Sequence, residues 1–164
     1  MKKIIYTNTD GAVHIVIPTA KENIEQMLGP LTQQEYEDHI YERSIPAGST
    51  KVRVIDDSDI PTTREFRNAW VDITKESRVD VCCTRAKNLA LDKLRINRNN
   101  KLKETDSVFM QALETNDTKK LDDIKKIRKD LRDLTEPLKA IVTTDKVNDE
   151  VILQQLRDLS MAAD

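Results

Sequence analysis

Two histidines are the first candidates for chemistry in this sequence. His14 lies between Val13 and Ile15 in a run that alternates like a surface-facing strand, and His39 lies in a helical pattern. Neither has a nucleophile or a second metal ligand at the spacing that catalysis or metal binding requires. We therefore expect neither histidine to be a catalyst or a metal ligand.

A run of carboxylates and a pair of cysteines are the remaining candidates. Residues 56–59 read Asp-Asp-Ser-Asp, but the glycine and the distal glutamate of a calcium loop are missing, which favours a turn followed by helix capping. Cys82 and Cys83 are adjacent, and two thiols alone rarely form a disulfide or a zinc site. The sequence also holds no nucleophile–base pair and no glycine-rich phosphate loop. It predicts a protein that is not an enzyme and binds no cofactor or metal.

The composition is that of an elongated helical protein with a thin core. Of 164 residues, 34% are charged, 38% are hydrophobic and only 4% are aromatic. The N-terminus lacks the apolar run and cleavage site of a signal peptide, and no segment approaches the roughly 20 apolar residues that cross a bilayer. We expect a soluble, intracellular protein with no membrane partner.

The elements that position these side chains are organised around two helices in residues 84–134. The first contains no proline or glycine from Thr84, its expected N-cap, to Glu114, and the second runs from Asp117 or Thr118 to Leu134. Because the break between them is short, we expect the helices to lie antiparallel. The expected apolar stripes are Leu91, Leu94, Leu102, Thr105, Phe109 and Ala112 or Leu113 on the first helix, and Leu121, Ile124, Ile127, Leu131 and Leu134 on the second.

The middle of the first helix is unusually polar. Residues 95–101 read Arg-Ile-Asn-Arg-Asn-Asn-Lys, with Ile96 as the only apolar residue. Two interpretations stay open: a solvated face or local kink, and a polar interface that a partner recognises through amide and guanidinium hydrogen bonds.

The same helix carries most of the positive charge. Residues 84–103 hold seven basic side chains against Asp92 alone, but no aromatic residue for base stacking precedes Phe109. We therefore do not expect nucleic acid to bind. The charge favours an acidic protein, or the acidic N-terminal half of a neighbouring copy, as partner.

The N-terminal part is predicted to mix strands and short helices. Two segments, Thr19–Glu22 and Thr32–Glu35, have the form of capping boxes that open helices. The other expected elements are a β-hairpin of residues 3–7 and 13–17 around Asp10-Gly11, a turn at 45–48, a strand at 51–55, and strands at 71–73 and 78–81 around a turn at 75–77.

Phe66 and Trp70 are the most informative pair in this part. They are four residues apart, so a single helical turn would place both on one face, and the only tryptophan is expected to anchor a small core.

These patterns predict an α+β fold in three parts. A small N-terminal domain with a β-hairpin and strands occupies 1–83, a long antiparallel helical hairpin occupies 84–136, and a short C-terminal helix with a tail occupies 137–164. The C-terminal helix itself is expected at 148–161.

Two stretches resemble small proteins of tailed bacteriophages and prophages. The first is Ile60-Pro61-x-x-Arg64-x-Phe66-Arg67-x-Ala69-Trp70, followed by Val79-Asp80-Val81. The second, Arg95-x-x-Arg98-Asn99-x-x-Leu102-x-x-Thr105-Asp106 followed by Ile127 to Leu134, is similar to the phage tail assembly chaperone, or tail fibre assembly, family. Arg128, Leu131, Arg132, Asp133 and Leu134 match the pattern of that family, whereas Ile127 replaces an aromatic residue and Val108-Phe109 stands where the family often carries a tryptophan.

The resemblance implies a non-enzymatic helper that binds a phage tail, tail fibre or other virion protein during assembly in the cytoplasm of the bacterial host. It leaves open a second role as a minor structural component of the virion, tail- or capsid-associated and held by symmetry-related copies. A homo-oligomer is compatible with both roles. The expected partner-binding residues are Arg95, Ile96, Asn97, Arg98, Asn99 and Asn100, together with Phe66 and Trp70.

Overall fold

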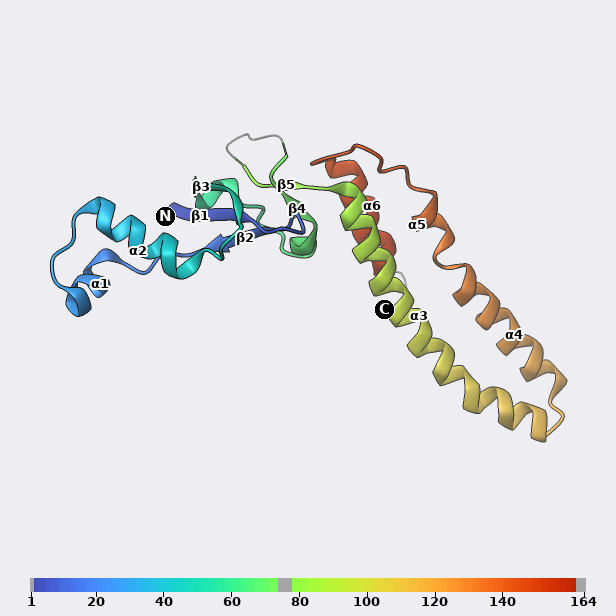
Figure 1. The fold of residues 1–164 in the computed structure, drawn as a ribbon. Helices are drawn as coiled ribbons and strands as arrows, with labels where there is room; N and C mark the ends of the chain where they lie inside the picture. The colour runs from blue at the N-terminus through green and yellow to red at the C-terminus, as the bar shows by residue number, and fades with distance from the viewer. Residues whose placement is uncertain (1, 74–77, 162–164) are drawn as a thin grey trace. The chain divides into compact units, whose positions relative to one another are not determined.

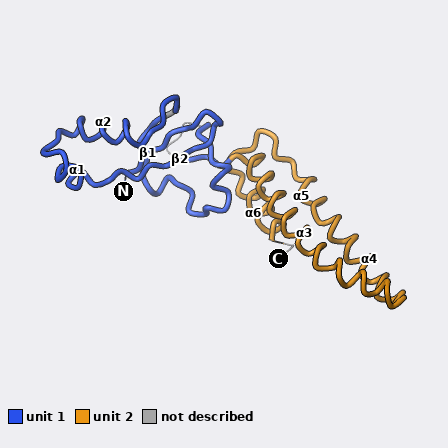
Figure 2. The backbone as a smooth tube through the Cα atoms, turned by 60° about the horizontal axis from the view of Figure 1, so that its bottom comes forward, with its two compact units in different colours: residues 1–81 blue, residues 82–164 orange. Residues whose placement is uncertain are grey.

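The chain forms two compact units, residues 1–81 and 82–164, in a computed structural model that describes residues 2–73 and 78–161 (Figure 2). The described strands all lie in the first unit, and the second unit is helical (Figure 1). The α+β class expected from the sequence is confirmed. The boundary between the units lies two residues before the expected one, and the hairpin and the C-terminal helix share one unit.

A three-stranded antiparallel sheet in the order β2-β1-β3 is the centre of the first unit. Its strands are β1 (Lys2–Thr7), β2 (Val13–Val16) and β3 (Thr50–Asp56). The predicted N-terminal hairpin is confirmed: Ile5 pairs with Ile15, and Gly11 takes a φ of 75° in the connecting loop. The predicted strand at 51–55 is β3, although its Val52 and Val54 are exposed.

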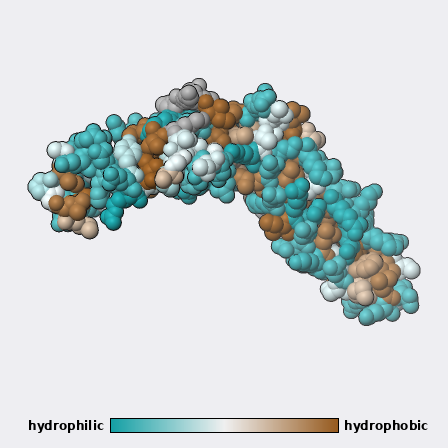
Figure 3. Space-filling view, in the orientation of Figure 1, coloured by the Kyte–Doolittle hydropathy of each residue, from teal (hydrophilic) through white to brown (hydrophobic). Residues whose placement is uncertain are grey.

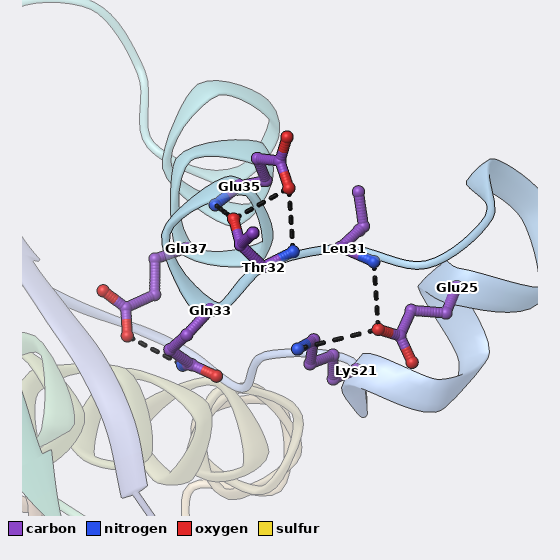
Figure 4. Close-up of polar contacts among 7 residues, drawn as sticks. All are labelled: Lys21, Glu25, Leu31, Thr32, Gln33, Glu35 and Glu37. Carbon is purple, nitrogen blue, oxygen red and sulfur yellow. Dashed lines mark hydrogen bonds and ion pairs between the residues drawn. The ribbon is translucent and has the colours of Figure 1, made fainter.

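The two helices of the first unit begin in different ways, although both were expected to begin with a capping box. In α2 (Gln33–Ser44) the box is present: the Glu35 N–H donates to Thr32 Oγ1, and the Thr32 N–H donates to Glu35 Oε2 (Figure 4). In α1 (Lys21–Leu28) the prediction is wrong, because the N-cap is Ala20 and makes no side-chain bond. The Thr19 carbonyl instead accepts a hydrogen bond from the Tyr36 hydroxyl at 2.8 Å.

The rest of the first unit consists of short elements. The predicted helical turn around Phe66 and Trp70 is a three-residue 3₁₀ turn, and both side chains are buried. The short elements of this region are the 3₁₀ turns η1 (Asp57–Asp59) and η2 (Arg67–Ala69) and the paired strands β4 (Trp70–Val71) and β5 (Asp80–Val81). The turn expected at 75–77 lies outside the described residues.

The second unit is arranged around its longest helix. The helices are α3 (Cys83–Glu114), α4 (Thr118–Asp133), α5 (Glu136–Ala140) and α6 (Glu150–Ser160). α4 returns beside the C-terminal half of α3, and α6 packs beside its N-terminal half (Figures 1 and 2). The turn before α4 places Asn116 at a φ of 53°, and the Asp117 carboxylate caps the Lys120 N–H at 3.0 Å.

The start of α3 differs from the prediction. Its N-cap is Cys82, not Thr84, and Cys82 makes no side-chain cap bond. The Thr84 hydroxyl instead donates to the Thr143 carbonyl at 2.9 Å and so ties the helix to the segment before α6. Both cysteines are free thiols, and burial raises the pKa of Cys83.

The apolar stripes expected on α3 and α4 are only partly buried. On α3, Leu91, Leu94 and Ala112 are buried, whereas Leu113 is exposed. On α4 only one stripe residue, Ile124, is fully buried. Because α4 packs on α3 alone over most of its length, the hairpin has a thin core.

Candidate partner-binding surface on the helical hairpin

The polar middle of α3 is helical throughout. Residues 95–101 lie inside one uninterrupted helix of 32 residues, so the helix does not break there. Asparagines are weak helix formers, and the flanking leucines that pack against neighbouring helices must hold this stretch in place. The segment therefore presents its polar side chains on a regular helical surface.

The helical twist divides the expected partner-binding residues between two faces. Leu94 is completely buried, and Ile96, two residues later, is 61% exposed on the opposite side. Asn99 and Asn100 are exposed together with Ile96, whereas Asn97 is half-buried. The exposed members of the expected partner-binding residues on α3 are therefore one apolar side chain, Ile96, and polar side chains around it.

The two arginines of the set make local contacts along the helix. Arg95 donates to Asp92 Oδ1 at 2.9 Å, one turn earlier. Arg98 is half-buried, and its Nε and Nη2 donate to Asn99 Oδ1 at 3.2 and 3.0 Å. These bonds engage the amide oxygen of Asn99, and the NH₂ group of the same side chain is a hydrogen-bond donor.

Phe66 and Trp70 do not join this surface. They belong to the first unit, where Phe66 is 5% and Trp70 is 1% exposed. Such burial leaves almost no area for a partner to contact. Their role in this structure is to fill the core of the first unit.

A groove between α3 and α4 adds an apolar surface that the sequence did not predict. It has a volume of about 350 Å³, and its exposed apolar residues are Val108 at 38% and Ile127 at 50%. It is lined by Lys101, Glu104, Thr105 and Val108 from α3 and by Ile124, Ile127 and Leu131 from α4. The spacing of Ile124, Ile127 and Leu131 predicted an apolar face on α4. Val108 was not predicted to contribute, because it lies off the apolar stripe expected on α3.

Arg128 of α4 contacts three residues of α3 close to this groove. Its Nη1 donates to Asp106 Oδ1 at 2.6 Å and to Thr105 Oγ1 at 3.3 Å. The guanidinium also lies over the ring of Phe109. The guanidinium thus bridges the two helices by hydrogen bonds and a ring contact.

The histidines, carboxylates and cysteines that were considered for chemistry form no metal-binding cluster in the described part of the chain. His14 stacks on Tyr6 with ring centroids 5.1 Å apart. Residues 2–73 and 78–161 contain no cluster of three His, Cys, Asp or Glu side chains that could hold a metal ion.

Among the described helices, none has the length and apolar character needed to span a membrane. Comparison of the chain with protein-family models, with curated proteins and with solved structures finds no match.

Proposed function

We propose that this protein is a non-enzymatic phage assembly helper that binds a tail or tail fibre protein through its α3–α4 hairpin during virion assembly. One observation carries the proposal: the hairpin leaves large apolar side chains exposed within a hydrophilic surface, seen in Figure 3 as brown areas among teal. The exposed apolar residues are Ile96, Val108, Met110, Leu113 and Ile127. Where exposed apolar side chains are rimmed by polar ones, they are typical of a surface that associates with a partner.

The outward face of α3 supplies the specific contacts. Ile96 provides an apolar centre, and Asn99, Asn100 and Arg95 surround it with hydrogen-bonding groups. An apolar centre with a polar rim is the usual anatomy of a protein interface. Binding there would cover apolar surface or strand edges of an unassembled tail protein and prevent its premature association.

Co-purification with candidate partners tests the proposal. The full chain is co-expressed with the tail and tail fibre proteins encoded in the same phage genome, and the captured proteins are quantified. Ile96→Ser is expected to reduce capture about tenfold, because central interface residues carry most of the binding energy. Val142→Ser is the matched control, since Val142 is 75% exposed but lies outside the hairpin.

Purified virions distinguish the helper from a minor structural component. A helper acts in the host cytoplasm and is absent from finished particles. Recovery of this protein from virions at a fixed copy number would replace the helper function by a structural one. Equal capture by the parent chain and Ile96→Ser would remove the α3 face from the proposal.

A further inference from the structure

The face of α3 on which α6 packs continues beyond the end of α6. Cys83, Ala86 and Ala90 recur at spacings of three and four on this face, and all three are buried. The backbone of Asp149, the N-cap of α6, hydrogen-bonds to Cys83, so the two helices start side by side. α6 has 11 residues and extends for about 16 Å, whereas the 32 residues of α3 extend for about 48 Å. More than half of α3 is therefore beyond the reach of α6.

The groove between α3 and α4 lies on this same face of α3. A straight α-helix completes five turns in about 18 residues, so residues at that interval point in the same direction. Val108 follows Ala90 by 18 residues, and Glu104 follows Ala86 by the same interval. Val108 and Glu104 both line the groove. The groove is thus the continuation, about five turns further along, of the face on which α6 packs.

α4 packs beside this face and leaves it open. Arg128 of α4 lies over the ring of Phe109, and Phe109 points about 100° around α3 from Val108. Val108 is 38% exposed and Ile127 of α4 is 50% exposed, on either side of the buried Ile124. The position that a third helix would take beside the hairpin is therefore lined by apolar side chains, and no described helix occupies it.

We propose that the α3–α4 groove binds an amphipathic helix of the partner protein, which packs on α3 as α6 does. α6 buries Leu153, Leu156 and Ser160, at spacings of three and four. The bound helix presents apolar side chains at the same spacing to Val108 and Ile127. An extended segment fits less well, because α3 and α4 pair their backbone groups internally and offer no strand edge to it. The tail protein as the source of this helix rests on the function proposed above.

The test uses the full chain and a synthetic helix, so it does not require the tail protein. The probe is a blocked alanine-based peptide of about 18 residues with lysine and glutamate for solubility, a length at which such a peptide is helical alone. It carries three leucines at spacings of three and four, which form one apolar stripe. The control peptide has the same composition, but its leucines are moved so that they point to different faces of the helix. Binding is measured by the NMR shifts of the Val108 and Ile127 methyl groups.

The expected result is that the striped peptide shifts the methyl signals of Val108 and Ile127, and that the control peptide binds more weakly. Val108→Ser, followed at Ile127, weakens binding of the striped peptide about three- to fivefold, because it removes apolar area from the contact. Ile127→Ser, followed at Val108, gives the same comparison from the α4 wall. Val142→Ser makes the matched change at an exposed valine outside the hairpin and leaves the affinity unchanged. Amide exchange in α4 shows whether each variant keeps the hairpin intact.

Three results would overturn the proposal. Unchanged Val108 and Ile127 signals with the striped peptide at about 1 mM would mean that the groove takes no helix. Equal binding of the striped and control peptides would leave only unspecific apolar contact. Shifts of the same methyl groups when the chain alone is concentrated would mean that a second copy fills the groove.

Capture of the tail protein separates this inference from the proposed function. If the striped peptide does not bind, and Val108→Ser captures the tail protein as well as the parent chain does, the groove is excluded and the proposed function stands. If the peptide binds but the parent chain captures no tail protein, the proposed function fails and the preference of the groove for a helix stands.

Discussion

The guanidinium carbon of Arg128 on α4 lies 5.5 Å from the centroid of the Phe109 ring on α3. The same side chain forms an ion pair with Asp106, one turn from Phe109 on the same helix. Arg128 is 23% exposed, so the contact is only partly screened by water. The contact therefore joins α4 to α3 in a part of the hairpin where the apolar core is thin.

The first prediction concerns this contact. Arg128→Lys keeps the charge near Asp106 but loses the planar group that stacks on Phe109, and it is expected to cost about 1 kcal/mol. Phe109→Leu removes the ring face, and a double-mutant cycle between the two positions should give a coupling of about 0.5–1 kcal/mol. Hydrogen exchange of α4 amides in the full chain measures the loss of stability in each variant and the coupling between the two positions. A coupling near zero would mean that the stacking contributes nothing.

The second prediction uses the two threonines of the first unit that were expected to cap helices. Thr32→Ala removes the acceptor for the Glu35 N–H and is expected to destabilise α2 by about 1 kcal/mol. Thr19→Ala is the matched control, because the N-cap of α1 makes no side-chain bond and the Thr19 contact to Tyr36 uses its backbone carbonyl. Amide exchange in α1 and α2 should change only for the first variant. Equal losses of protection would contradict the capping geometry.

The third prediction is a pH dependence at Glu35. The hydrogen bond from the Thr32 backbone N–H, followed by that from the Thr32 hydroxyl, lowers the pKa of Glu35 below its ordinary value. Because the pKa of Glu35 is lower in the folded chain, its ionised carboxylate stabilises α2 at pH values above the pKa that Glu35 has in the unfolded chain. This stabilisation is lost as the pH falls through the pKa of the folded state.

Glu35→Gln tests this dependence. Glutamine can still occupy the third position of a capping box but does not titrate. Exchange of the α2 amides in the variant is therefore expected to respond less to acidification than in the parent chain. An unchanged acid response would assign the effect to other carboxylates, among which Asp57 also has a lowered pKa because Lys3 hydrogen-bonds to it.

The fourth prediction concerns the ion pair of Arg53 and Asp72 in the first unit. Asp72 is 3% exposed, and it accepts from Arg53 Nη2 at 2.9 Å and from Nε at 3.3 Å. Asp72→Ala removes a buried acceptor from a largely covered guanidinium. We expect a loss of about 2 kcal/mol, less than for a wholly buried pair, because Arg53 is 25% exposed. Lys3→Gln, which removes the exposed pair with Asp57, should cost much less, and denaturant unfolding of the first unit compares them.

Local patterns predicted most elements of the fold. The hydrophobic period and the lack of proline and glycine located α3 to within two residues of Cys83–Glu114, and Asp10-Gly11 located the β-hairpin of β1 and β2. The two capping boxes show the limit of such patterns. Thr32 and Glu35 form the box, but Thr19 turns its carbonyl to Tyr36, a contact across 17 residues that no local pattern contains.

The candidate surface was less predictable than the fold. The outward position of Ile96 follows from helical twist once Leu94 is known to be buried. The groove beside Val108 and Ile127 depends on how α4 packs against α3, which the pattern of either helix alone does not contain. Phe66 and Trp70 were expected among the partner-binding residues, and Trp70 was also expected to anchor a small core. Burial on folding decides between interface and core, and here both side chains are in the core.

The fifth prediction separates folding from binding with two residues of α3. Leu94→Ala creates a cavity at a completely buried position and is expected to cost about 3 kcal/mol. Ile96→Ala, two residues later and 61% exposed, should cost less than about 0.5 kcal/mol, as is usual for surface positions. If the proposed function holds, Ile96→Ala reduces capture of the tail partner without changing the unfolding of the second unit, whereas Leu94→Ala lowers both. A large destabilisation by Ile96→Ala that grows with protein concentration would instead mean that a second copy of the chain covers this face.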